Sequence, residues 1–141
     1  MSRGPIRWKV SFNSAPERVY QALSTEEGRL SFWAEEAAER DGAIVFRFAN
    51  GWRETSTIKQ AIPHTLFEIV YFGALTRFEI EAAEAGAVLT LTAEGVPDRD
   101  WDEVHAGWVS ALLSMKAAID FEIDLRNHSA TRTWEAGFVD V

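Results

Sequence analysis

The chain has 141 residues, a formal net charge of −8 at pH 7 and no cysteine. Its length fits one domain, and a composition with 47% hydrophobic and 12% aromatic residues indicates a packed core rather than a disordered chain. The lack of cysteine excludes disulfides, thiolate zinc sites and cysteine nucleophiles, and the acidic balance argues against nucleic acid or an anionic membrane as the main partner. No stretch approaches the ~20 apolar residues of a membrane span, and the short polar segment Met1–Pro5 does not resemble a signal peptide, so we expect a cytoplasmic protein without membrane insertion.

The N-terminal part predicts one strand and two short helices. Apolar and polar residues alternate from Ile6 to Phe12, the pattern of a strand with one buried face. The sequence from Ser14 to Glu17 predicts a capping box, with Ser14 as the N-cap of a helix that runs to about Leu23. Thr25 is a second N-cap, and the short helix that follows it is expected to end near Phe32 and Trp33.

Strands dominate the middle of the chain. Asp41-Gly42 and Asn50-Gly51 are strong signals for hairpin turns. Alternating or β-branched runs around them predict further strands at Ala43–Phe48, Trp52–Ile62, Thr65–Phe72, Thr76–Ala82 and Val88–Ala93. About six strands joined by short turns must pair mainly antiparallel, as a meander.

The last predicted element is a long amphipathic helix. Asp100 is its expected N-cap, and apolar residues recur from Trp101 onward at three- and four-residue steps. We expect the helix to run to about Arg126, roughly 39 Å at 1.5 Å per residue. A curved sheet and such a helix each have an apolar face that the other can cover, so residues 1–141 form one α+β domain with a core at 6–126 and a tail at 127–141.

This order of elements resembles the helix-grip fold of the Bet v 1-like and START-like (SRPBCC) superfamily. In that fold a curved antiparallel β-sheet wraps around a long C-terminal α-helix, and two short N-terminal helices close one end. The segment Ser14–Leu23 is similar to the family's first helix, Phe32-Trp33 to the aromatic pair that ends the second, and His105-Ala106-Gly107-Trp108 with Leu112 and Lys116 to the start of the final helix. These motifs most resemble the branch named for the activator of Hsp-90 ATPase homologues, over Ile6–Arg126, and the tail resembles one bacterial subgroup of that branch.

The resemblance implies an apolar cavity between the sheet and the final helix, with no cofactor. Large side chains of the sequence that could line it are Phe32, Trp33, Phe46, Phe48, Trp52, Phe67, Tyr71, Phe78, Trp108, Leu112 and Met115. Aromatic residues also dominate ordinary cores, so the sequence leaves open whether these side chains fill the interior or leave a pocket.

Few residues point to catalysis or metal binding. No two of His64, His105 and His128 have the spacing of a helical metal site, so we expect no metal. His105 lies three residues before Trp108 and is the best candidate acid–base group, paired with Glu54 or Tyr71; the alternatives are a boundary histidine and a Glu54 in a cross-strand pair on the solvated face. His128 is expected to cap helix carbonyls. The acidic run at 98–103 lacks the glycine and glutamate of a calcium loop and is explained by helix capping.

The sequence therefore predicts binding of a small hydrophobic molecule, lipid- or polyketide-like, without a cofactor. One alternative is a protein-interaction domain that modulates a chaperone-type partner. Another is a homodimer formed through an outer apolar patch at Val45, Val70 and Phe72. A third is a cyclase- or dehydratase-like enzyme; we expect binding rather than catalysis.

Overall fold

The computed structural model describes residues 3–141. Residues 1 and 2, part of the segment expected to be polar and without a signal sequence, lie outside the described part. The elements in chain order are β1 (Ile6–Phe12), α1 (Pro16–Ser24), α2 (Glu26–Leu30), β2 (Glu36–Arg40), β3 (Ala43–Arg47), β4 (Arg53–Ile62), β5 (Leu66–Tyr71), β6 (Ala74–Ala83), β7 (Gly86–Glu94) and α3 (Asp98–Phe121).

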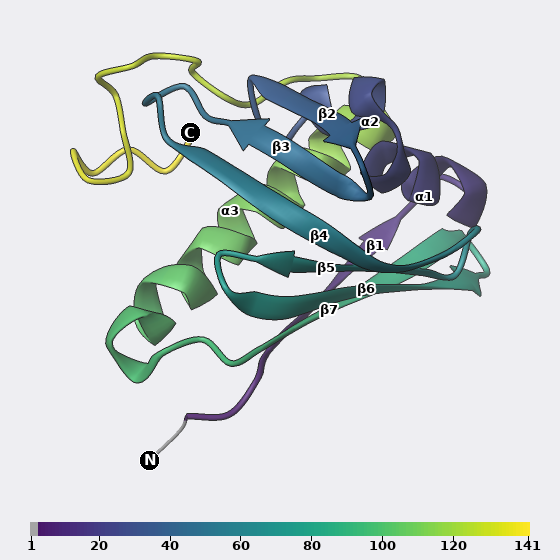
Figure 1. Ribbon diagram of the computed structural model, residues 1–141. Coiled ribbons are helices and arrows are strands. Elements are labelled where there is room, and N and C mark those ends of the chain that lie inside the picture. Colours follow the sequence, from purple (N-terminus) through teal and green to yellow (C-terminus); the bar gives the residue numbers. More distant parts are fainter. Residues whose placement is uncertain (1–2) are drawn as a thin grey trace.

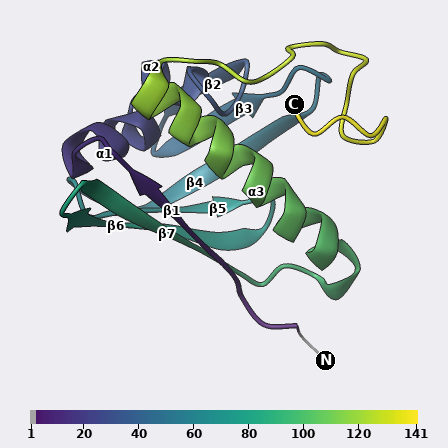
Figure 2. The ribbon, with the colours of Figure 1, turned by 180° about the vertical axis from the view of Figure 1, so that it is seen from behind.

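The strands form one antiparallel sheet in the order β1-β7-β6-β5-β4-β3-β2. A register shift between Ile58 and Gln60 interrupts the β4–β5 pairing, and such bulges bend a strand. The curved sheet holds α3 against one face, and α1 and α2 lie at one end of it (Figure 1; Figure 2 shows α3 from behind). The expected helix-grip architecture is confirmed.

The core lies between the sheet and α3. Alternate strand residues point inward, as the buried positions of β3 and β6 show. The apolar stripe of α3 meets them, with Trp108, Leu112, Met115 and Ile119 all at most 5% exposed. One continuous cluster of buried side chains thus joins both layers.

Strand β2 is absent from the sequence prediction, which gave about six strands instead of seven. Its charged and alanine residues have low strand propensity, so no pattern marks it. Pairing with β3 through the Asp41-Gly42 turn makes it a strand; both residues have positive φ, as a type I′ hairpin turn requires. Arg29, only 1% exposed, donates two hydrogen bonds to the carbonyl of Ala37 and one to that of Leu23, which ties β2 to α1 and α2.

Two helix starts differ from the prediction, and one agrees. The N-cap of α1 is Ala15, which makes no side-chain cap hydrogen bond, and the hydroxyl of Ser14 one residue earlier donates to Asp120 of α3 at 2.8 Å. The predicted N-cap Asp100 lies inside the first turn of α3, which begins after Pro97. Thr25 caps α2 as predicted, accepting a hydrogen bond from the Gly28 N–H at 3.0 Å.

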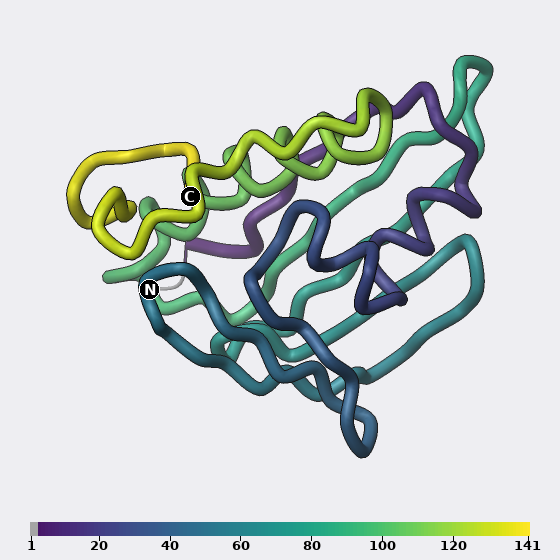
Figure 3. Tube along the Cα trace, turned by 90° about the horizontal axis from the view of Figure 1, so that it is seen from above, coloured from purple at the N-terminus to yellow at the C-terminus, as the bar shows by residue number. Residues whose placement is uncertain are grey.

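The end of α3 also differs from the prediction. The helix stops at Phe121, because Glu122 adopts the left-handed conformation with φ 55°. The residues from Ile123 to Arg126, expected to be helical, therefore belong to the tail. The tail turns back alongside α3, which Figure 3 shows in yellow beside the green helix.

Candidate functional site

A cleft of about 590 Å³ opens between the sheet, the first half of α3 and the tail. Its volume lies in the range of small-molecule sites, roughly 300–1,000 Å³. The lining residues come from five parts of the fold: the loop before β2 (Phe32, Trp33, Ala34, Glu35), the β3–β4 hairpin (Phe48, Ala49, Asn50, Trp52), the β5–β6 hairpin (Tyr71, Phe72, Ala74, Thr76), the segment from β7 through α3 (Ala93, Val96, Pro97, Asp100, Glu103, Val104, Gly107, Trp108, Ser110, Ala111) and the tail (Arg126, Asn127, His128, Ser129, Thr133, Trp134, Glu135, Val141).

Three aromatic side chains make the floor of the cleft. Trp33, Tyr71 and Trp108 pack on one another, with ring centroids 5.5 Å apart for Trp33–Tyr71 and Tyr71–Trp108 and 6.2 Å apart for Trp33–Trp108. The indole N–H of Trp33 donates to the Tyr71 hydroxyl at 3.2 Å. Burial raises the pKa of Tyr71, so its hydroxyl stays protonated and can itself donate to a ligand oxygen.

The β5–β6 hairpin brings a fourth ring to the cleft through a strained turn. Phe72 has φ 48° and Gly73 has φ 78°, and a positive φ is costly for a residue with a large side chain. The Glu54 carboxylate accepts a hydrogen bond from the Phe72 N–H at 2.7 Å and so stabilises this turn. Phe72 lies 47% exposed, with its ring centroid 6.1 Å from that of Phe48.

The structure divides the residues predicted to line the cavity into two groups. Phe32, Trp33, Phe48, Trp52, Tyr71 and Trp108 lie on the wall of the cleft. The others are at most 4% exposed and pack in the core beneath it: Phe46, Phe67, Phe78, Leu112 and Met115. Phe46 and Phe78 support Trp33 from behind, with ring centroids 4.8 Å and 5.7 Å from it.

The candidate catalytic residues do not meet. The His105 ring stacks between Trp8 and Trp101, each with its ring centroid 4.6 Å away, and is not part of the cleft wall. The Glu54 carboxylate accepts the hydrogen bond from the Phe72 N–H. The geometry therefore gives His105 the role of a packed boundary residue and Glu54 that of a turn-stabilising one.

The tail forms a wall of the cleft that the sequence reasoning did not foresee. Arg126 is its main anchor: the side chain is 5% exposed, and its guanidinium donates to the carbonyl of Ala34 at 3.1 Å and of Leu30 at 2.6 Å. The same group binds Asp124 at 2.9 Å, which holds the side chain in place. Ser110 of α3 donates to the carbonyl of Val139 and fixes the far end of the tail.

His128 joins the tail to the loop before β2 instead of capping α3, as had been expected. One ring nitrogen meets the Glu35 carboxylate and the other meets Asp124 at 2.6 Å. The hydrogen bonds that the His128 ring donates to the carboxylates of Glu35 and Asp124 raise the pKa of His128 and favour its charged form. Burial alone would raise the pKa of Asp124, but hydrogen bonds from Arg126 and His128 outweigh it and lower that pKa to about 2.

The surface of α3 at Gly107 borders open space. A Cβ atom placed there would find no heavy atom within 4 Å outside its own helix segment. Gly107 lines the cleft one residue before Trp108, and its backbone φ is not of the kind that demands glycine. A glycine in mid-helix costs stability relative to alanine, so its presence at the wall of a cleft is consistent with a need for space.

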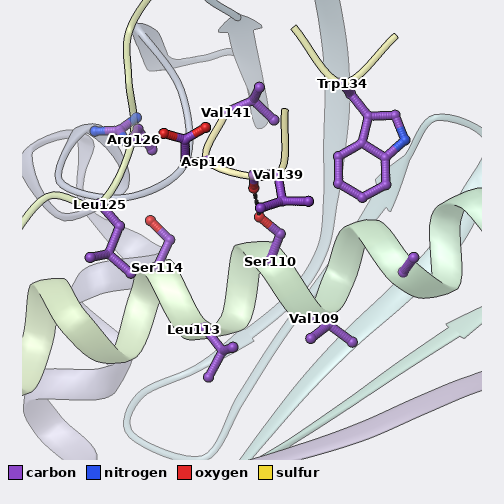
Figure 4. Close-up of a pocket in the computed structure, with 11 residues that line it drawn as sticks. Val109, Ser110, Leu113, Ser114, Leu125, Arg126, Trp134, Val139, Asp140 and Val141 are labelled. Carbon is purple, nitrogen blue, oxygen red and sulfur yellow. Dashed lines mark hydrogen bonds between the residues drawn. The ribbon is translucent and has the colours of Figure 1, made fainter. Parts of the chain in front are cut away.

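A second, smaller hollow of about 460 Å³ lies between α3 and the tail. Ser110, Arg126, Trp134 and Val141 line both hollows, so the two adjoin. Figure 4 shows Ser110 and Ser114 of α3 pointing toward the tail, with the hydrogen bond from Ser110 to Val139 drawn as a dashed line.

Among residues 3–141, no helix is both long and apolar enough to cross a membrane. No group of three or more His, Cys, Asp or Glu side chains in the same range is placed to hold a metal ion.

Comparisons with known proteins agree on the fold. Residues 13–120 match the model of the family described as Activator of Hsp90 ATPase homolog 1-like protein. The protein SSP2350 from Staphylococcus saprophyticus has a similar structure, with a TM-score of 0.77 and 22% identity over 86% of this chain and 96% of that one. The Aha1 dimer from Colwellia psychrerythraea gives a TM-score of 0.75 and 23% identity over 83% of this chain and 96% of that one.

A third likeness is more distant in sequence. The AHSA1-like protein from Aeromonas hydrophila gives a TM-score of 0.71 at 14% identity, over 79% of this chain and 89% of that one. Curated proteins give no match. At these identities the similar structures establish the fold of the chain, and they do not identify a ligand.

Proposed function

Because the chain belongs to the family of Activator of Hsp90 ATPase homolog 1-like proteins, we propose that it uses the family's sheet-and-helix scaffold to bind a small, mostly apolar molecule in the cleft. The observation that carries this proposal is the aromatic floor of Trp33, Tyr71 and Trp108 beside the open space at Gly107. A ligand of lipid- or polyketide-like character would pack on this floor, where Trp33 and Trp108 are already 7% and 5% exposed, and would cover the apolar surface that Trp52 and Phe72 still expose in the cleft.

The charges around the cleft favour a neutral ligand over an anionic one. The two basic residues of the lining, Arg126 and His128, already bind the carboxylates of Asp124 and Glu35. The other charged residues of the lining are Asp100, Glu103 and Glu135, all acidic. A ligand carboxylate would therefore meet like charges, whereas a hydroxyl or carbonyl can use the Tyr71 hydroxyl.

A pocket-filling variant tests the proposal without breaking the fold. N-phenyl-1-naphthylamine, a neutral probe whose fluorescence rises in apolar sites, is titrated into the wild type, Gly107→Leu and Ala106→Leu. Gly107→Leu places a side chain in the cleft and should weaken binding at least about tenfold, because the added carbons occupy the space that the probe needs. Ala106 is exposed and lines only the smaller hollow, so its variant is the matched control.

The outcomes separate three cases. Binding that is lost in Gly107→Leu alone supports the cleft. Binding that is lost in Ala106→Leu alone moves the site to the smaller hollow. No binding by the wild type contradicts the proposal.

A second candidate function is self-association, and a different surface favours it. A stripe of apolar side chains on α3 and the start of the tail is 38–57% exposed: Val109, Leu113, Phe121, Ile123 and Leu125. Three of them, Val109, Leu113 and Leu125, also line the smaller hollow. Exposed apolar patches of this kind mark interaction sites, and the Colwellia psychrerythraea neighbour is described as a dimer. We propose this stripe, rather than the predicted patch at Val45, Val70 and Phe72, as the contact between two copies. Val45 and Val70 are only partly exposed, and Phe72, which is 47% exposed, lines the cleft.

Light scattering tests the second candidate. The wild type should have the mass of two chains at high concentration, and Leu113→Lys should return it to one chain, because a charge would be buried at the contact. A monomeric wild type would contradict self-association. A chaperone-type partner would then be the next candidate to bind the same stripe.

A further inference from the structure

We propose that the tail from Glu122 to Val141 is the specificity-determining wall of the cleft, and that Trp134 is a ligand-contacting residue on it. The ligand class this implies is a planar aromatic molecule, held by indole rings from the domain and from the tail. The inference rests on the proposed function and goes beyond it, since it assigns the ligand class to a segment outside the family match.

The tail lies outside the residues that match the family. The match to the family covers residues 13–120 and ends just before the tail begins. Yet the tail supplies eight of the residues that line the cleft, more than any single loop of the sheet. This segment thus contributes lining from outside the range that matches the family, and specificity within a common fold is often carried by such elements.

The tail is a built structure rather than a loose end. Asn127 closes it into a loop: its backbone N–H donates to the carbonyl of Asp140 at 2.7 Å, and its side-chain amide donates to the Asp140 carboxylate at 3.1 Å and to the carbonyl of Arg132 at 3.0 Å. Arg126 and His128 fasten one side of this loop to the domain, and Ser110 fastens the other. A wall fixed at both ends can hold a side chain in a defined position against a ligand.

Trp134 is the large apolar side chain that this loop presents to the cleft. It lies in the turn at residues 134–137, and its carbonyl closes that turn by accepting from the Gly137 N–H at 2.9 Å. Its side chain is half-buried and lines both hollows. A tryptophan whose indole ring faces a cleft offers a large, rigid surface for stacking, and its side chain loses little conformational entropy on binding.

Rings recur on the other walls of the same cleft. Trp33 and Trp108 belong to the floor, and Phe48 and Phe72 belong to the two hairpins. Flat aromatic faces from separate walls favour a flat aromatic ligand over a flexible chain, because ring stacking is directional and a flexible chain loses more conformational freedom on binding.

The experiment compares two tail variants of the full chain with N-phenyl-1-naphthylamine as the aromatic probe and n-dodecanol as a neutral chain competitor. Trp134→Ala should weaken probe binding about 2- to 10-fold, the amount expected for one lost ring contact. Phe138→Ala is the matched control: it removes an aromatic ring from the same tail, 39% exposed, that lines neither hollow, and should leave the dissociation constant unchanged. Trp134→Phe should restore most of the affinity, and dodecanol should displace the probe only weakly.

The results distinguish failure of this inference from failure of the proposed function. Equal affinity of the wild type and Trp134→Ala, with binding still lost in Gly107→Leu, would overturn the inference and leave the cleft as the ligand site. Equal losses of probe affinity in Trp134→Ala and Phe138→Ala would show that binding depends on the order of the tail and not on the indole contact. That result would also overturn the inference. No binding by the wild type would refute the proposed function and this inference together.

Discussion

Replacing Arg126 with alanine should release the tail while the domain stays folded. The Arg126 side chain is 5% exposed, and its guanidinium makes two of the hydrogen bonds that join the tail to the domain, to the carbonyls of Ala34 and Leu30. A hydrogen bond from a charged group contributes about 1.5–3 kcal/mol, and these carbonyls regain water once the tail opens, so the two together should contribute about 2–3 kcal/mol to keeping the tail closed. At 1.4 kcal/mol per factor of ten, the closed tail should become about 30- to 150-fold less favoured.

Native-state hydrogen exchange measures this opening directly. The Asn127 amide, which donates to the carbonyl of Asp140, should lose protection by that factor in Arg126→Ala, because the local opening free energy falls. Amides of β6 and β7 should keep theirs. Arg132→Ala, a change at an exposed arginine of the same tail, is the control and should exchange like the wild type. A change below threefold at Asn127, or an equal loss of protection in the sheet, would refute the reasoning.

Three further predictions test other parts of the structure. Because the folded-state pKa of His128 is raised, its ion pairs stabilise the tail fully below the ordinary pKa of about 6.5 and lose this effect as pH rises through the raised value. An NMR titration should show that Glu35→Gln brings the pKa of His128 back toward about 6.5. An unchanged pKa in that variant would contradict the pairing. Gly28→Ala should destabilise the domain by about 2 kcal/mol or more in urea unfolding, because the new Cβ would lie 2.5 Å from backbone atoms of α1; a near-neutral variant would argue against this close helix contact. Gly107→Ala should instead stabilise it by about 0.5–1 kcal/mol, since the site is helical and open, and a loss of stability would mean that the space is filled.

The sequence predicted the fold well where local patterns match the final packing. The alternation from Ile6 to Phe12, the Asp41-Gly42 turn and the Thr25 cap each depend on a few neighbouring residues, and the structure confirms them. Strand β2 escaped because its residues have no strand pattern of their own and become a strand only through β3 and the buried Arg29.

The site was harder to predict than the fold. The pattern of large apolar residues does not distinguish Phe78, which is buried beneath the cleft, from Tyr71, which forms its floor, because both lie on inward faces of neighbouring strands. That difference depends on how side chains from separate elements meet. Gly107 carried a usable signal, a glycine in mid-helix without a turn to explain it. The wall made by the tail depends on contacts such as Arg126 to Ala34, which are remote along the chain.

The most direct test of the central claim, that the cleft binds a small apolar molecule, is an amide-resonance titration of the labelled protein. The panel consists of a fatty acid, a sterol, a flavonoid and an aromatic polyketide. We predict saturable shifts at Trp33, Gly107 and Trp134 with the flavonoid or the polyketide, and weak or no shifts with the fatty acid, whose carboxylate would face the acidic rim. No saturable shift with any compound, or shifts confined to the outer residues around Leu113, would contradict the claim.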